Sequence, residues 1–349
     1  MVAFLRSALT MAACAVIAVS VSTMPTRAAD ESKDLQSQID TLKKQVNKLQ
    51  AKLKYMRVEN DPINGLAGPH VIFEGCNVHV RSGSGDSVDG TVDLSNRAPI
   101  ENTTPTGLGN LIIGYDEQPL VGDTARGGSH NLVIGPGHNF TSVAGAVLGQ
   151  QNRLTGPLAS VTSGFNNEAS RIGASVSGGL GGTASGKYSS VSGGQGNTAS
   201  ATFTSVTGGS TNVANYGSAS IHGGYNNQAS GDYAIVAGGD SNTATGKYAA
   251  ISGGHANLAS GTAASVSGGE GNVAEGFFAS VSGGTFCKAS EYYASVSGGV
   301  DNVASGPAAS VSGGRGNRAT AYYASVSGGK DRLADEDYDW AAGSLIEDQ

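Results

Sequence analysis

Cysteine is rare in this sequence, and its scarcity excludes one class of secreted protein. Three cysteines occur in 349 residues, namely Cys14, Cys76 and Cys287. Cys14 lies in the N-terminal apolar segment, and the other two are far apart in the chain. Scaffolds held by disulfides need several cysteines at short spacings. The chain must therefore fold by other means.

Charged, aromatic and large apolar residues are also scarce, whereas glycine is abundant. Charged residues make up 14% of the chain and aromatic residues 6%, with a single Trp, against 54 Gly. Globular domains usually contain about 25% charged residues and about 7% glycine. A conventional enzyme core of Leu, Ile and Phe is therefore not expected, and the 9 Pro without a Gly-X-Y period exclude collagen. These properties favour a repetitive β-architecture built from small residues.

Residues 1–29 have the features of a secretory signal peptide. Arg6 precedes an apolar run over residues 7–24, and small residues before position 30 form a cleavage zone. A retained membrane anchor, or a lipoprotein acylated at Cys14, is the alternative. No later segment is long and apolar enough to predict a membrane span. We expect an exported protein that is extracellular or held at the cell surface.

Residues 30–60 are predicted to form a coiled coil. Apolar residues recur at the a and d positions of a heptad between residues 33 and 57, and Pro62 should prevent the helix from continuing. The alternative is a single amphipathic helix lying on its own domain. We expect this segment to assemble a homotrimer. A dimer is the alternative, because these a and d residues favour coiled coils of two helices. The predicted oligomerisation residues are Leu35, Ile39, Leu42, Val46, Leu49, Leu53 and Met56.

From residue 146 to residue 334 the chain repeats every 15 residues. A glycine recurs without insertion from Gly149 to Gly329, and a Val or Ile lies three residues before it in each copy after the first. A fixed short period without a helical run predicts a solenoid of stacked 15-residue turns, here called rungs. Residues 61–145 are expected to form an N-terminal cap of irregular β-structure, and residues 335–349 a C-terminal cap in which Tyr338 and Trp340 cover the last rung. The predicted repeat core is Val161, Val176, Val191, Val206, Ile221, Val236, Ile251, Val266, Val281, Val296, Val311 and Val326.

Alternation along a strand predicts which residues of each rung point inward. If the Val of Ser-Val-Ser-Gly-Gly faces the interior, then the Ala two residues before it and the first Gly of the pair face inward too. On the second strand, Asn and Ala share the inner face. Stacked Asn side chains can then form hydrogen bonds from rung to rung. This core is thin, and subunit association is the simplest way to bury more surface.

These repeats resemble the head repeats of trimeric autotransporter adhesins, the YadA-like left-handed parallel β-roll. The resemblance rests on repeat copies such as residues 183–194, Thr-Ala-Ser-Gly-Lys-Tyr-Ser-Ser-Val-Ser-Gly-Gly, which other copies precede with Asn, and on the units ending at Gly114 and Gly135. It covers roughly residues 108–343 and implies an all-β solenoid, a left-handed roll, a trimer and a role in adhesion. Three features depart from the family. Gly replaces its usual Ile in most copies, the coiled coil precedes the head, and residues 335–349 do not resemble its C-terminal membrane anchor.

No pattern of catalytic residues is apparent, and we expect no enzyme activity, cofactor or metal. His70, Cys76 and His79 could gather around a metal, but without a fourth nearby ligand they are interpreted as ordinary cap residues. Cys287 replaces the repeated Asn in one rung and is interpreted as a small buried substitute. Removal of Arg6 and Arg27 with the leader would change the net charge from −7 to −9, which argues against a nucleic-acid partner.

A column of aromatic residues is a candidate functional surface. Stacked rings could brace neighbouring rungs, or an exposed aromatic row could bind a glycan or an extracellular-matrix protein. We expect an adhesin-like binding module, with a non-binding structural scaffold or coat protein as the alternative. Ice binding by the repeated Ser-Val-Ser face is a further hypothesis. The predicted aromatic ladder is Tyr188, Phe203, Tyr233, Tyr248, Phe278, Tyr293 and Tyr323.

Overall fold

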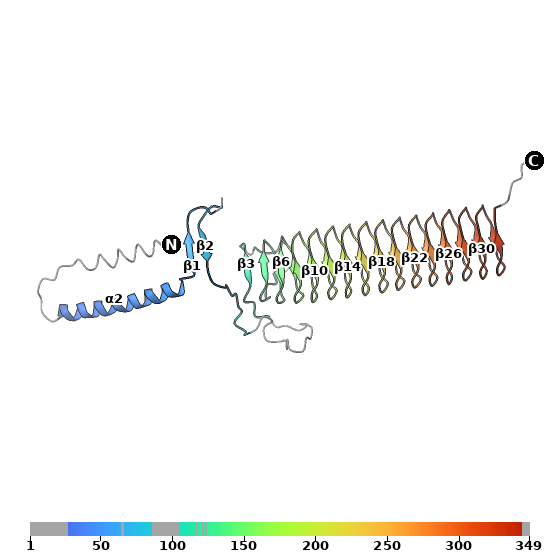
Figure 1. Ribbon diagram of the computed structural model, residues 1–349. Helices are drawn as coiled ribbons and strands as arrows, with labels where there is room; N and C mark the ends of the chain where they lie inside the picture. Colours follow the sequence, from blue (N-terminus) through green and yellow to red (C-terminus); the bar gives the residue numbers. More distant parts are fainter. Residues whose placement is uncertain are drawn as a thin grey trace, which may run out of the picture. The chain divides into compact units, whose positions relative to one another are not determined.

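The computed structural model describes residues 27–63, 66–85, 105–115, 117–120, 122 and 124–343. The chain divides into two compact units, residues 1–79 and residues 80–349 (Figure 1). Residues 1–26, which carry most of the predicted leader, and residues 344–349 of the predicted C-terminal cap lie outside the described residues.

Within its described residues, the first unit contains one helix and a small antiparallel sheet. Helix α2 spans Arg27–Lys52, and strands β1 (Met56–Glu59) and β2 (His70–Phe73) follow it. The helix ends earlier than the heptad pattern predicts, so Leu53 and Met56 lie outside it. The physical reason is strand pairing, because Met56 pairs with Phe73 and Glu59 with His70. That pairing commits the backbone after residue 55 to an extended conformation.

The second unit is a parallel β-solenoid in which every rung contributes short strands to two long sheets (Figure 1). We call the 16-stranded sheet the serine sheet, because Ser fills most of its outward positions. Its strands are β3 (Leu111–Ile113), β4 (Leu132–Ile134), β6 (Ala146–Leu148), β8 (Ser160–Val161), β10 (Ser175–Val176), β12 (Ser190–Val191), β14 (Ser205–Val206), β16 (Ser220–Ile221), β18 (Ile235–Val236), β20 (Ala250–Ile251), β22 (Ser265–Val266), β24 (Ser280–Val281), β26 (Ser295–Val296), β28 (Ser310–Val311), β30 (Ser325–Val326) and β32 (Trp340–Ala341).

The second sheet has 14 strands and is called the alanine sheet, because Ala ends most of its strands. Its strands are β5 (Asn139–Phe140), β7 (Arg153–Leu154), β9 (Glu168–Ala169), β11 (Thr183–Ala184), β13 (Thr198–Ala199), β15 (Val213–Ala214), β17 (Gln228–Ala229), β19 (Thr243–Ala244), β21 (Leu258–Ala259), β23 (Val273–Ala274), β25 (Lys288–Ala289), β27 (Val303–Ala304), β29 (Arg318–Ala319) and β31 (Leu333–Ala334). Between the two strands of a rung lies one further residue, which pairs with its equivalent in the next rung, as Asp240 does with His255.

The register confirms the predicted parallel solenoid with 15-residue spacing. Ser175 pairs with Ser190 and Val191 with Val206, and the same offset continues through the repeats. Both sheets begin upstream of residue 146, because β3, β4 and β5 already belong to them. Part of the region expected to be a separate cap is therefore built into the solenoid.

The end of the repeat array also differs from the expectation of a cap. Strand β32 pairs in parallel with β30, with Trp340 opposite Ser325. Tyr338 and Trp340 are 72% and 64% exposed, so they do not cover the last rung. They belong instead to one further rung of the same solenoid.

The interior of the solenoid is a narrow stack of small side chains. The predicted Val/Ile column is buried throughout, from Val161 to Val326. Two Ala per rung, such as Ala249 and Ala259, and one Asn, such as Asn257, are buried beside it. Each rung therefore has too little apolar volume to be stable alone and depends on the rungs above and below it.

The glycine pair at the corner of each rung does not follow the predicted alternation. A Cβ added to the first glycine, as at Gly238, meets nothing within 4 Å, so this position faces open space and not the interior. The second glycine, Gly239, has φ +89°, and a Cβ there would lie 2.3 Å from the carbonyl oxygen of Gly254 in the next rung. Alternation ends at the corner because the left-handed backbone turns the chain, and the second glycine is the one the fold requires.

Candidate binding surface: the aromatic column

The predicted aromatic ladder occupies one corner of the solenoid, between a strand of the alanine sheet and the next strand of the serine sheet. Every member has a left-handed backbone, from φ 54° at Tyr188 to φ 59° at Phe203. The backbone N–H at this corner donates to a carbonyl of the preceding rung, as Tyr248 does to Asp232 at 2.8 Å. Tyr338 occupies the same corner, with φ 63°, and is an eighth aromatic member, although it was predicted to belong to the C-terminal cap. We call these eight residues the aromatic column.

A left-handed backbone is an unusual place for a bulky aromatic residue. Glycine and asparagine adopt this region most readily, and other side chains are disfavoured there by roughly 1–2 kcal/mol. The corner keeps the same backbone whatever its side chain, since Ser218 and Ala263 both have φ 57°. The aromatic side chains are therefore not needed to make the turn. The aromatic side chains must therefore be favoured by the contacts that their rings make.

The rings of the column stack in pairs on consecutive rungs. Tyr188 stacks on Phe203 with centroids 5.5 Å apart, and Tyr233 stacks on Tyr248 at 5.2 Å. Phe278 stacks on Tyr293 at 5.2 Å, and Tyr323 stacks on Tyr338 at 5.4 Å. Parallel pairs of this kind contribute about 0.5–1.5 kcal/mol beyond the area they bury. Stacking therefore offsets part of the backbone strain at these corners.

The column has a second, longer period that the 15-residue repeat conceals. Between consecutive stacked pairs, one rung carries a small residue in place of the ring, first Ser218, then Ala263, then Ala308. Two aromatic rungs and one small rung thus alternate every 45 residues. The spacing of the aromatic residues in the sequence carries this signal, but it becomes apparent only when the corners are aligned.

A second short column of rings lies beside the first towards the C-terminal end. Phe277 stacks on Tyr292 at 5.1 Å, and each lies edge-on to its sequence neighbour. Tyr322 makes the same edge-on contact with Tyr323 at 4.4 Å. This second column is not among the predicted residues, although the doublets Phe-Phe and Tyr-Tyr at successive corners are its signal in the sequence.

The stacked rings remain open to solvent. The seven predicted ladder residues are 44–60% exposed, so the rings brace neighbouring rungs and still present an apolar surface. Basic and acidic groups lie beside some of them. Lys247 Nζ lies 5.2 Å above the ring of Tyr248 and 3.8 Å from a carboxylate oxygen of Asp232. The surface combines exposed aromatic faces with charged groups, which is typical of ligand-binding surfaces.

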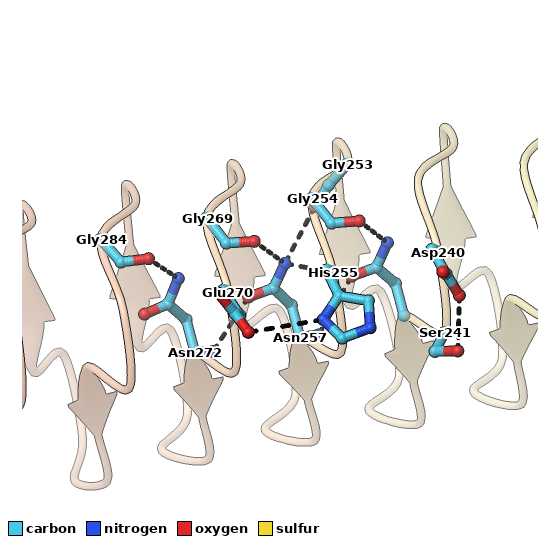
Figure 2. Close-up of polar contacts among 11 residues, drawn as sticks. Asp240, Ser241, Gly253, Gly254, His255, Asn257, Gly269, Glu270, Asn272 and Gly284 are labelled. Carbon is cyan, nitrogen blue, oxygen red and sulfur yellow. Dashed lines mark hydrogen bonds and ion pairs between the residues drawn. The ribbon is translucent and has the colours of Figure 1, made fainter.

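A buried ladder of asparagines keeps the rungs, and with them the column, in register (Figure 2). Asn257 Oδ1 accepts a hydrogen bond from the backbone N–H of Asn272 at 2.9 Å. Asn257 Nδ2 donates to the carbonyl oxygens of Gly253 and Gly269, each at 3.0 Å. This network confirms the predicted hydrogen bonding from rung to rung and satisfies the buried amide completely.

Other residues replace Asn at several rungs of this ladder, among them Cys287 and His138. Cys287 is buried, as predicted, and its backbone N–H donates to Asn272 Oδ1 at 2.9 Å, while burial raises the pKa of its thiol. His138 lies one rung before Asn152. Its Nδ1 accepts the backbone N–H of Asn152 at 3.2 Å, and its Nε2 donates to the carbonyl of Ile134 at 3.0 Å. His138 thus reproduces both roles of the asparagine side chain.

The remaining residues singled out in the sequence do not form a site. Within the described ranges no group of three or more His, Cys, Asp or Glu lies close enough to hold a metal ion, and Cys76 is exposed. Among the helices that the structure describes, none is both long and apolar enough to cross a bilayer. No known family model and no curated protein matches the sequence.

Proposed function

We propose that the protein is an exported, adhesin-like binding module that presents the aromatic column to a glycan or an extracellular-matrix protein. The observation that carries this proposal is the placement of exposed aromatic rings at left-handed corners where smaller residues make the same turn. In this proposal the rungs coil left-handedly, as in the adhesin heads that the repeats resemble. The leader at residues 1–29 takes the protein to the cell surface or the extracellular space.

Self-association through helix α2 is the second part of the proposal. The d residues of the heptad are half exposed in the single chain, with Leu35 at 50%, Leu42 at 58% and Leu49 at 57%. An apolar stripe of this kind is stabilised by burial against other copies of the same helix. A homotrimer would place three aromatic columns on one particle, with a dimer as the alternative.

A binding array of glycans and matrix proteins tests the binding surface. The full chain should bind saturably, and replacing Tyr188 and Tyr233 by Ser should weaken that binding at least tenfold. Ser is suitable because Ser218 already makes the same turn. The control is Ser265→Ala on the serine sheet, which should bind as the unchanged protein does. Binding that survives the loss of both rings would show that another surface is used.

The alternative function is a structural scaffold or coat protein. It is favoured by the serine sheet, whose outward positions are mostly uncharged Ser over many consecutive rungs. Absence of saturable binding to any array member, together with retained assembly, would support the scaffold over the adhesin.

Assembly is tested by the mass of the protein in solution. Leu42→Asp combined with Leu49→Asp places charges in the apolar stripe and should give monomers. Lys44→Asp combined with Asn47→Asp adds acidic residues to the outer face of the same helix and should leave the mass unchanged. An unchanged mass for the first variant would show that α2 is not the assembly element.

A further inference from the structure

The rung that carries Ala308 leaves a vacancy in the aromatic column between two pairs of tyrosines. Tyr292 and Tyr293 lie one rung before it, and Tyr322 and Tyr323 lie one rung after it. The backbone fixes this arrangement, because Ala308 N–H donates to the carbonyl of Tyr292 at 2.7 Å and Tyr323 N–H donates to that of Pro307 at 3.0 Å. We call these four tyrosines, with Pro307 and Ala308 as their floor, the tyrosine box.

Aromatic faces form the walls of the box. Tyr293 stacks on Phe278 with an interplanar angle of 2°, so its opposite face is turned towards the vacant rung. Tyr323 stacks on Tyr338 with an angle of 10° on the far side and likewise turns its free face to the vacancy. All four tyrosines are 43–52% exposed, so the space between them is open to solvent.

The separation of the walls suits a compact cation. Two strand spacings separate Tyr293 from Tyr323, or roughly 10 Å. A cation midway between them would lie about 5 Å from each ring, inside the limit of about 6 Å for cation–π attraction. The column already shows this contact elsewhere, since Lys247 Nζ lies 5.2 Å from the ring centroid of Tyr248.

The charges around the box also favour a cation. Glu291 precedes the first pair of tyrosines, and Asp337 accepts a hydrogen bond from the N–H of Tyr322 at 3.1 Å. Residues 289–314 and 319–329 contain no Lys or Arg. Lys288, the basic residue just before this stretch, lies 2.9 Å from the carboxylate of Glu275. The charged residues next to the tyrosines at this part of the corner are therefore acidic, and the basic residue Arg318 lies on strand β29, four residues before Tyr322.

A second copy of this column does not fit the vacancy. Each stacked pair of rings spans two rungs, whereas each vacancy spans only one rung. A stacked pair from a second copy of the column is therefore too thick to enter the vacancy. The other vacancies are also less suited to a cation. Ala263 lies between Tyr248, which already has Lys247 above it, and Phe278, and Ser218 lies between single rings.

We propose that the tyrosine box binds an organic cation, an alkylated ammonium group carried by the ligand. This inference rests on the proposed function, because it takes the aromatic column to be the ligand-binding surface. Beyond the proposed function, this inference specifies the chemical class of the recognised group, an alkylated ammonium, and the vacancy at Ala308 that binds it.

Choline and its uncharged isostere 3,3-dimethyl-1-butanol are the probes. In NMR titrations of the full chain, choline should shift the tyrosine ring signals saturably, and the isostere should bind at least fivefold more weakly. Ala308→Phe should abolish choline binding, because the ring fills the vacancy at a corner that holds Phe in other rungs. Tyr323→Ser should weaken binding at least fivefold, and Ala263→Phe, which fills a different vacancy, should leave it unchanged.

Each result decides for or against the box. Equal binding of the two probes, choline binding retained by Ala308→Phe, or no saturable shift with choline would overturn the inference. The proposed function fails separately. Array binding that is lost in the Tyr188 and Tyr233 variant but kept in Ala308→Phe supports the adhesin without the cation site. Choline binding without any array ligand supports the cation site without the adhesin.

Discussion

The asparagine ladder shows how one side chain can set the register of a repeat. Each Asn uses its carbonyl oxygen to accept from the next rung and its amide to tie two corner carbonyls together. In a narrow buried interior, each of these bonds also prevents the loss of stability that an unpaired buried group would cause. Register therefore depends on polar groups as much as on the Val column.

Restoring the ladder at Cys287 should stabilise the protein. The thiol makes only long contacts, such as 3.5 Å to the carbonyl of Gly299, where asparagines in other rungs donate at about 2.9 Å. We expect Cys287→Asn to raise the free energy of unfolding by about 1 kcal/mol. Thermal and denaturant unfolding would measure the change, with Cys287→Ala as the control that removes the thiol without adding an amide. Equal stability of the two variants would contradict this account.

His138 should make stability depend on pH. Burial lowers the pKa of its imidazole below the ordinary value of about 6.5, because a charged ring would lose hydration. The neutral ring is the form whose Nδ1 accepts the backbone N–H of Asn152. Above pH 6.5 the ring is neutral in both folded and unfolded chains, and its stabilising contribution is complete. As the pH falls below 6.5, the unfolded chain binds a proton first, so stability decreases towards the lowered folded-state pKa.

The matched variant is His138→Asn, since Asn fills the same role in later rungs. Unfolding measured between pH 7 and pH 5 should show a smaller decrease for this variant than for the unchanged protein. Identical pH profiles would show that His138 does not carry the effect.

At the scale of elements, the corners rather than the strands limit which residues are tolerated. The strands of the repeats are two residues long, whereas the second corner glycine is required by both its φ and the nearby backbone of the next rung. Gly239→Ala should reduce the free energy of unfolding by about 1–3 kcal/mol, while Gly238→Ala should change it little. Urea unfolding of the two neighbouring variants checks this, and a similar loss in both would refute the distinction.

The sequence was informative about the elements wherever their contacts repeat. The period alone located the Val column, because identical rungs can pair only in one register. It did not locate the end of helix α2, since the pairing of Met56 with Phe73 is a contact between segments that do not repeat. It also misplaced the first corner glycine, because alternation assumes an extended backbone and Gly239 leaves it. The tyrosine box was not predicted from the sequence, because its tyrosines come from the two rungs on either side of Ala308 and are far apart along the chain.

At the scale of the whole molecule, the solenoid is close to a one-dimensional stack. Each strand pairs only with its equivalents in the neighbouring rungs, so stability is the sum of rungs and the interfaces between them. Removing a whole rung should therefore preserve the fold as long as the register of 15 residues is kept.

Deletion of residues 250–264 tests this property. It joins Ala249 to Ser265, which occupy successive positions of the repeat, and removes the vacancy at Ala263. We expect the same circular dichroism spectrum and a melting temperature within a few degrees, as expected for about 1 kcal/mol in a chain of this size. Tyr248 would then stack on Phe278. A deletion of residues 250–260, which breaks the period, is the control and should lose cooperative unfolding.

The 45-residue period of the aromatic column limits which in-frame duplications of the coding sequence would preserve the column. Duplication of a single 15-residue unit would keep the backbone in register but would put the ring pairs and vacancies out of phase. The order of two aromatic rungs and one small rung is kept from Tyr188 to Tyr338. In-frame exchange of three rungs at a time preserves both patterns. Recombination in that unit would extend the reach of the molecule and add one more vacancy at each step.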